Sequence, residues 1–299
     1  MENRLLVAGT AAFDTIESPY GKRERVLGGS GVYTSLSAKF FVKPILLTTV
    51  GGDFNFEELL SNNGIDIKLI SQLKEEKTFH WNGSYLKDLN NAETVNTELN
   101  VLLKFNTKIP TKVQNTEYLF LANIDPDFQI KILNQMKNLK FSGLDTMNFW
   151  INSKKDMIFS LLTEISVMFI NENELKLLSE ENNVFKGAKK ILSRGLKNLV
   201  VKRGEYGSIL FSEKNIFILP AFPLEEVVDP TGAGDTFAGA FMGYVAQREC
   251  FDFKTLKEAL IWGTVAASFC VSDFSVSKML SINFEDLAKR KDEFIAFLL

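Results

Sequence analysis

The stretch Asp229-Pro-Thr-Gly-Ala-Gly-Asp235-Thr-Phe-Ala-Gly-Ala-Phe-Met-Gly243 is the most informative part of this chain of 299 residues. Its first glycines precede a predicted helix, whose leading backbone N–H groups lack partners and carry partial positive charge. A phosphoryl group can be held there without a lysine, and Gly232 and Gly234 allow close approach of the backbone. A carboxylate beside a phosphate makes sense if Asp235 accepts a proton from an attacking hydroxyl. The stretch therefore predicts an anion site with a base attached.

A simpler interpretation makes Asp235 an N-cap and uses Gly239 and Gly243 only for close helix packing. Capping does not require two glycines before the acid, however. The stretch also matches neither G-x-x-x-x-G-K-[ST] nor G-x-G-x-x-G. Neither of these two familiar nucleotide loops explains it.

The same stretch resembles the C-terminal signature of the ribokinase (PfkB) family of carbohydrate and nucleoside kinases. The resemblance implies that Asp235 is the catalytic base. It also implies that the backbone amides of Gly232, Ala233 and Gly234 form the anion hole for the transferred phosphate, with Thr231 on the nucleotide side. ATP and Mg²⁺ are the implied cosubstrate and cofactor.

Composition narrows the function classes. The chain is 45% hydrophobic, has a net charge of −3 and a pI near 5.5, so we expect a globular α/β protein and neither nucleic acid nor membrane as a partner. It has two cysteines and one histidine, which argues against a disulfide framework or a zinc site. The N-terminal apolar run is too short for a signal peptide, and no run approaches 18 apolar residues, so we expect a cytoplasmic protein.

Short apolar runs alternate with longer helix-like stretches along the chain. This alternation predicts a mainly parallel central sheet with helices on both faces, and the resemblance implies that residues 1–299 form a single ribokinase-like domain. Several runs end in polar residues at the carboxyl edge, where ligands of open α/β sheets bind. The predicted strands are Leu5–Ala8, Pro44–Thr49, Tyr118–Ala122, Ser142–Asp145, Val167–Ile170 and Asn198–Lys202.

Two segments, residues 15–27 and approximately 77–105, break this rhythm because polar and aromatic residues alternate in them. We expect them to form a small separate sheet. The resemblance implies that this sheet is a lid over the acceptor site and a candidate homodimer contact. The aromatic residues of the second segment are typical of packing or of an interface, and would favour a nucleoside if they face the ligand; they are Phe79, His80, Trp81 and Tyr85.

The acceptor end is predicted near the first strand, where Asp14 follows a glycine turn. A carboxylate suits a sugar because it accepts hydrogen bonds from two neighbouring hydroxyls, although a turn-capping role is the alternative. The segment that follows has the order Gly28-Gly29-Ser30-Gly31-Val32-Tyr33 and resembles the family's first signature. In ribokinases a lysine and an asparagine usually stand where Ser30 and Tyr33 are, which weakens the case for ribose itself. Tyr33 is interpreted either as a stacking residue or as core.

The nucleotide end is predicted around Asn171 and Glu174, which match the family's Asn-x-x-Glu motif. That motif implies that Glu174 takes part in the Mg²⁺–phosphate network through water, while a helix-start acid is the alternative. Lys202 stands where the family usually has threonine, and Gly204 follows in the turn beneath the nucleotide. The resemblance also raises Asp229 as a K⁺ ligand.

These observations predict an ATP-dependent kinase that phosphorylates a hydroxyl of a small sugar or sugar derivative, with Asp235 as base. A nucleoside is the second acceptor class, because of the aromatic segment. A phosphorylated sugar ranks lower, since Lys22, Arg23 and Arg25 are more simply a solvated basic loop. The alternative from another class is a catalytically silent relative that binds a sugar or nucleotide.

Overall fold

The computed structural model describes residues 3–90 and 92–298. Its α-helices are five to 18 residues long and its strands four to nine, in the alternating order that the apolar runs predict. In chain order the elements are β1 (Asn3–Ala8), β2 (Ala12–Ser18), β3 (Gly21–Gly28), α1 (Ser30–Ala38), β4 (Lys43–Gly51), α2 (Glu57–Asn62), β5 (Asp66–Leu73), β6 (His80–Ser84), β7 (Glu93–Glu98), η1 (Asn100–Lys104), η2 (Val113–Asn115), β8 (Tyr118–Leu121), α3 (Pro126–Leu133), β9 (Phe141–Leu144), α4 (Asn148–Leu161), β10 (Val167–Asn171), α5 (Glu172–Ser179), α6 (Val184–Leu192), β11 (Asn198–Lys202), η3 (Gly204–Tyr206), β12 (Ser208–Ser212), β13 (Ile216–Leu219), α7 (Ala233–Arg248), α8 (Phe253–Cys270), α9 (Ser277–Ser281) and α10 (Phe284–Leu298).

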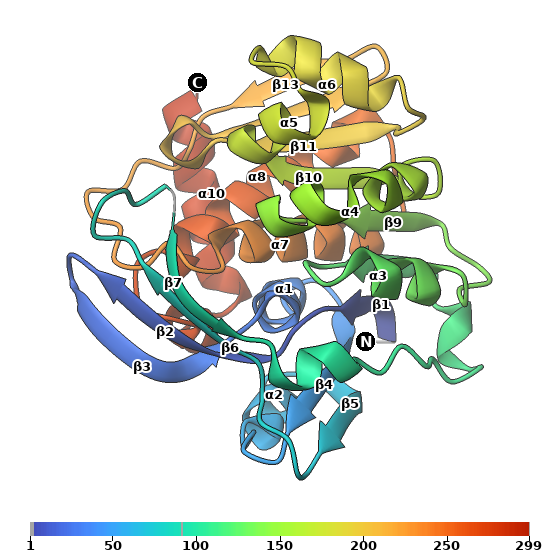
Figure 1. The fold of residues 1–299 in the computed structure, drawn as a ribbon. Coiled ribbons are helices and arrows are strands. Elements are labelled where there is room, and N and C mark those ends of the chain that lie inside the picture. Colours follow the sequence, from blue (N-terminus) through green and yellow to red (C-terminus); the bar gives the residue numbers. More distant parts are fainter. Residues whose placement is uncertain (1–2, 91, 299) are drawn as a thin grey trace.

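The main sheet of the described residues has nine strands in the order β13-β12-β11-β10-β9-β8-β1-β4-β5. It is parallel from β11 to β5, and β12 and β13 continue it as antiparallel strands. All six predicted strands lie in it, as β1, β4, β8, β9, β10 and β11. Figure 1 shows the helices arranged on both faces of this sheet. The predicted mainly parallel α/β architecture is confirmed.

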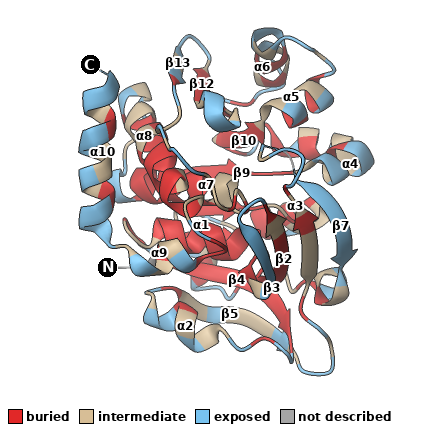
Figure 2. Ribbon diagram, turned by 90° about the vertical axis from the view of Figure 1, so that its left-hand side faces the viewer, coloured by how far each residue is buried: buried red, intermediate tan, exposed pale blue. Residues whose placement is uncertain are grey.

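Two apolar cores lie on the two faces of the main sheet, because successive strand side chains point in opposite directions. Leu5 and Val7 pack with α1, α7 and α8, whereas Leu6 and Ala8 pack with α3, α4, α5 and α6. Figure 2 shows that α1, α7 and much of α8 are buried, while α10 keeps one face exposed. The body of α7 from Thr236 to Ala246 is therefore packed on all sides, whereas its first three residues, 233–235, are partly exposed.

A second sheet, in the order β3-β2-β6-β7, stands apart from the main sheet (Figure 1). β2 pairs with β3 antiparallel and with β6 parallel, and β7 pairs with β6 antiparallel. Asp14 lies within β2 and not in a turn after β1. The residues of β7 are all exposed, as are the first five of β3.

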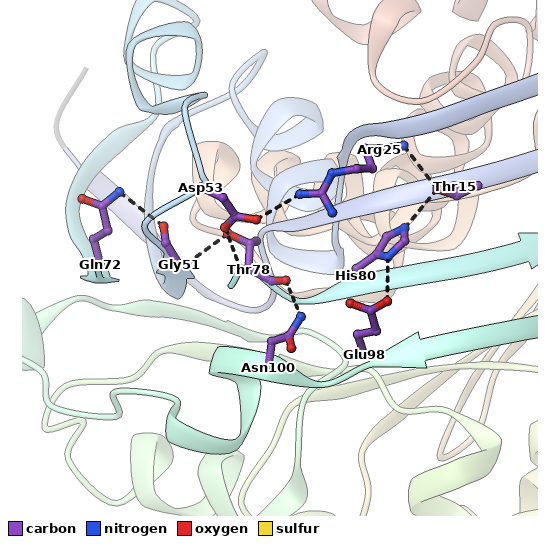
Figure 3. Close-up of polar contacts among 9 residues, drawn as sticks. All are labelled: Thr15, Arg25, Gly51, Asp53, Gln72, Thr78, His80, Glu98 and Asn100. Atoms are coloured by element: carbon purple, nitrogen blue, oxygen red, sulfur yellow. Dashed lines mark hydrogen bonds and ion pairs between the residues drawn. The ribbon is translucent and has the colours of Figure 1, made fainter. Parts of the chain in front are cut away.

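A compact polar junction connects the base of the second sheet to the turn after β4 (Figure 3). The Asp53 carboxylate accepts the backbone N–H and the hydroxyl of Thr78, both at 2.7 Å, and the guanidinium of Arg25 at 2.9 Å. The Thr78 hydroxyl in turn accepts a hydrogen bond from the N–H of Gly51. The backbone carbonyl of Thr78 accepts one from the side-chain amide of Asn100. The Gly51-Gly52-Asp53 turn therefore has a structural role.

Candidate active site

The carboxyl ends of neighbouring parallel strands bring the predicted nucleotide residues to one edge of the main sheet. Asn171 at the end of β10 pairs in register with Lys202 at the end of β11, and Asp145 directly follows β9 on the other side. The chain first builds the sheet from β1 toward β5 and then returns to the far side of β1 with β8. Ligands of open α/β sheets bind at such a reversal, outside the carboxyl ends.

The loop before α7 is held by Asp229. This side chain is buried, its Oδ1 accepts the N–H of Thr231 at 2.9 Å, and its Oδ2 accepts the N–H of Ser275 at 2.8 Å. Gly232 has a φ of 74°, and a Cβ there would stand 2.4 Å from the ring of Tyr33. Both its conformation and its surroundings thus require glycine.

Gly232, and not Asp235, is the N-cap of α7. Asp235 lies in the first turn of that helix, where the backbone N–H groups of the first residues have no partner within the helix. The capping interpretation of Asp235 is therefore wrong, and its carboxylate is left at an electropositive helix start.

A buried ion pair lies beside this loop. The Lys202 Nζ is 2.8 Å from the Asp145 Oδ2, and the two side chains are only 17% and 6% exposed. A Cβ at Gly234 would be 2.9 Å from the same Nζ, so the ammonium lies against the glycines of the loop. Burial alone would lower the pKa of Lys202, but Asp145, Glu174 and Asp235 outweigh it and raise that pKa. One lysine therefore faces three carboxylates.

The three carboxylates have raised pKa values. Burial raises the pKa of Asp235 to about 7, with the charge of Asp145 adding to the effect and Lys202 opposing it. Burial likewise raises the pKa of Glu174 to about 7, and Asp145 contributes again. The pKa of Asp145 itself is raised by burial and lowered in part by Lys202. A carboxylate with a pKa near neutrality can accept and release a proton at ordinary pH.

Asn171 and Glu174 form a capping box at the start of α5. The Asn171 Oδ1 accepts the Glu174 N–H, and the Glu174 Oε2 accepts the Asn171 N–H, both at 2.8 Å. The cap satisfies two backbone donors and fixes the Glu174 carboxylate at the end of β10, where it interacts electrostatically with Lys202 and Asp145.

Asp14 lies in β2 of the second sheet, and its carboxylate fills the space over Gly28. A Cβ at Gly28 would be 1.8 Å from the Asp14 Oδ2, so only glycine fits there. The backbone N–H of Gly29 donates to this carboxylate. Burial, and then the charges of Asp229 and Asp235, raise the pKa of Asp14 to about 8. The second sheet thus brings a carboxylate close to the start of α7.

Ser30 and Tyr33 serve the protein itself in this structure. The Ser30 hydroxyl receives the N–H of Thr10 and donates to the carbonyl of Asn123, both at 3.2 Å. The Tyr33 ring is buried against Gly232, and its hydroxyl has no hydrogen-bond partner among the described residues. Tyr33 therefore packs under the loop.

Gly204 follows β11 with a φ of 56° and begins η3. A Cβ on it would be 2.1 Å from the Asn90 Oδ1. Asn90 lies in the connection between β6 and β7, so the second sheet also reaches the turn after β11.

Sequence reasoning placed Lys202 in the site and Asp145 at the carboxyl end of a predicted strand, but it did not pair the two. The sequence did carry one signal for the Lys202–Asp145 ion pair, because it places an acid and a lysine at the carboxyl ends of nearby strands. Tyr85 was noted only as one of four aromatic residues, and its hydrogen bond to Thr231 could not be read from the chain. Two surface hollows, lined by residues between 155 and 215, contain none of the groups described above.

No three acidic, histidine or cysteine side chains are arranged around a common metal position in residues 3–90 and 92–298. A cation at this edge would take most of its ligands from water and phosphate, as Mg²⁺ commonly does. Among the described helices, none combines the length and the apolar composition needed to cross a bilayer.

Comparison with known proteins settles the family. Residues 14–283 match the pfkB family of carbohydrate kinases. The chain belongs to the pfkB family. Within it, the chain is 30% identical over 249 residues to the cytidine kinase of Thermococcus kodakarensis, covering 80% of this chain and 88% of that one.

Solved structures show that this chain has the ribokinase-like fold. The nucleoside kinase of Burkholderia thailandensis in complex with inosine superposes with a TM-score of 0.82 at 15% identity, over 98% of this chain and 99% of that one. The ribokinase of Arabidopsis thaliana, complexed with ribose and ATP, gives a TM-score of 0.78 at 20% identity, over 97% and 99% of the two chains.

Proposed function

We propose that this pfkB-family protein transfers the terminal phosphoryl group of ATP to a hydroxyl of a nucleoside, with Asp235 as the base. A free sugar is the second candidate acceptor. The observation that carries the proposal is that two carboxylates flank the same loop: Asp14 lies against Gly28 at the start of α1, Tyr33 of α1 packs under Gly232, and Asp235 follows in the first turn of α7. One is suited to orient an acceptor hydroxyl and the other to receive its proton.

The names of the relatives and the apolar side chains of the second sheet both support a nucleoside as the acceptor. The first three similar curated proteins are named as a cytidine kinase and two nucleoside kinases, each matched over at least 80% of this chain. Trp81 and Val26 are the cross-strand neighbours of Asp14, and an apolar cluster that includes Ile16 and Tyr85 continues along that sheet. A flat base with an attached ribose suits an apolar wall beside a carboxylate better than a sugar alone does.

Asp235 takes the hydroxyl proton as the oxygen attacks. The N–H groups of Gly232 and Gly234 would bind the phosphoryl oxygens, and the neighbouring Lys202 ammonium would add positive charge on the same side. The Ala233 N–H donates to the Pro230 carbonyl at 3.2 Å and would exchange that partner for a phosphoryl oxygen. Thr231 and Gly204 line the approach on the nucleotide side. The second sheet would exclude water from the acceptor and so limit wasteful ATP hydrolysis.

Mg²⁺ fits this edge of the sheet because Glu174 offers a carboxylate there and the described residues form no closed cage. When bound, Mg²⁺ would neutralise charge on the phosphates, held by Glu174 through water. For Asp229 we propose a structural role in place of K⁺ coordination, because both of its oxygens already accept backbone N–H groups.

The test is ADP release by the purified protein with Mg²⁺·ATP. The acceptor panel includes cytidine, other nucleosides, ribose and sugar phosphates. We expect turnover with at least one nucleoside and a loss of about 10³-fold or more in kcat for Asp235→Asn. Asp292→Asn, at an exposed position of α10, is the matched control.

Turnover with free sugars and with no nucleoside would show that the acceptor is a sugar. Near-normal activity of Asp235→Asn would refute its role as the base. If no acceptor in the panel is turned over but ligands still raise the melting temperature, the protein would be a binding protein without kinase activity.

Three further expectations stay predictions. We propose that residues 1–299 act as one kinase domain with the second sheet as its lid, and that the protein works in the cytoplasm. A homodimer through the exposed strands of the second sheet is tested by sedimentation, and a strict monomer at high concentration would exclude it.

A further inference from the structure

The second sheet meets the phosphoryl-transfer loop through one side-chain hydrogen bond. The Thr231 hydroxyl donates to the phenolic oxygen of Tyr85 at 3.2 Å, and both side chains are buried. Tyr85 directly follows β6, and Thr231 directly precedes the N-cap of α7. Residues 146 positions apart in the chain are thus joined at the place where phosphate is expected to bind.

Tyr85 is held in place by the strand that carries Asp14. Its backbone N–H donates to the carbonyl of Glu17 in β2 at 2.8 Å. Its ring packs in a small apolar cluster with Ile16 of the same strand and with Phe274, which follows α8. Any movement of β2 and β6 relative to the main sheet therefore moves the Tyr85 hydroxyl away from Thr231.

Thr231 has little freedom to follow such a movement. Its N–H donates to Asp229, and its carbonyl accepts the thiol of Cys270 at 3.5 Å. The junction around Thr78 and Asp53 fixes the other end of β6 (Figure 3). The seven residue-to-residue steps from Thr78 to Tyr85 span about 23 Å when extended, so a small rotation at the junction is a large displacement at Tyr85.

We propose that Tyr85 is a positioning residue: when the second sheet is seated over the acceptor, its bond to the Thr231 hydroxyl adds to the contacts from Asp229 and Cys270 and holds the loop of Gly232–Gly234 in its phosphate-binding form. This inference rests on the proposed kinase function for its effect on rate. Acceptor binding under the sheet is thereby linked to formation of the anion hole. The phenolic proton of Tyr85 is not used in the bond from Thr231 and remains available to a ligand.

The experiment has one arm that needs no turnover. Backbone hydrogen exchange of residues 229–236 is compared in the wild type, Tyr85→Phe and Tyr20→Phe without any ligand. Tyr85→Phe keeps the ring and removes only the hydroxyl, and Tyr20 is an exposed tyrosine of the same sheet. We expect faster exchange in Tyr85→Phe alone, by about tenfold. Equal exchange in the two variants would overturn the inference.

The second arm measures steady-state kinetics of Tyr85→Phe, Thr231→Val and the double variant. We expect Tyr85→Phe to lower kcat about tenfold with little change in the KM for ATP, and to have no further effect in the Thr231→Val background. A purely structural role would lower the melting temperature and leave kcat unchanged in the folded fraction; this outcome, or two additive effects, would overturn the inference. If the wild type turns over no acceptor, the proposed function fails, and the exchange arm alone decides the role of Tyr85.

Discussion

Lys202→Met offers a quantitative test of the site's electrostatics. In the folded protein the ammonium is 2.8 Å from Asp145 and also lowers the pKa values of Glu174 and Asp235. Methionine keeps most of the side-chain volume and removes the charge. The variant leaves three buried carboxylates without a cation, and breaking one partner of such a buried pair costs about 3–5 kcal/mol.

The loss of stability should depend on pH, and its sign follows from proton binding. The folded variant raises the pKa values of the carboxylates further, so it holds more protons than the folded wild type near neutrality. Its stability then falls faster as the pH rises. Asp235 and Glu174 already hold protons below about pH 7 in the wild type, so the additional proton in this range is mainly that of Asp145, whose pKa Lys202 lowers. One additional bound proton changes the slope by about 1.4 kcal/mol per pH unit, which sets an upper limit of about 3 kcal/mol between about pH 5.5 and about pH 7.5. The penalty is therefore smaller in acid and larger near neutrality.

The assay is urea unfolding followed by tryptophan fluorescence at both pH values. Lys39→Met is the control, because burial lowers the pKa of Lys39 to about 8, so this lysine stays charged through the same pH range. Its substitution should shift stability equally at both pH values. If Lys202→Met also showed equal losses at both, the lysine would not be neutralising the carboxylates and the reasoning would fail.

Three other outcomes follow from the same geometry. Gly232→Ala should destabilise the protein and abolish turnover, since the left-handed φ and the Tyr33 ring both exclude a Cβ. The control is Gly64→Ala, where φ is 82° and the space around the glycine is open. Urea unfolding of this control should show only the backbone strain, a loss of about 1 kcal/mol in stability. The pH profile of kcat/KM should rise through about pH 7 as Asp235 ionises, and a profile that falls with pH there would contradict its role as base. Asp14→Asn should be more stable than the wild type at about pH 8 and no more stable at about pH 4, because the raised pKa makes ionised Asp14 unfavourable to the fold only as the pH rises; denaturant midpoints at the two pH values check this.

Local patterns predicted six strands of the main sheet, because a parallel strand buried on both faces is a continuous apolar run bounded by polar residues. They missed β5, β12 and β13, of which β5 and β13 are the partly exposed edge strands of that sheet. The same holds for the loop before α7, where Gly232 and the helix start are contiguous in the chain. Asp14 was predicted to bind the acceptor from a position just beyond a glycine turn, and that role stays a prediction. The structure places Asp14 within β2 of the second sheet, which the chain did not reveal because its apolar neighbours lie on other strands.

The chain itself thus determined the sheet class, the glycine-rich helix start and Asp235, because these depend on residues adjacent in sequence. Only the tertiary structure decided that Lys202 pairs with Asp145, 57 residues away, and that Tyr85 reaches Thr231. It also decided the pKa values near 7 at Asp235 and Glu174. Burial and charges from distant segments set these properties, and sequence spacing carries no information on either until the sheet order brings the strand ends together.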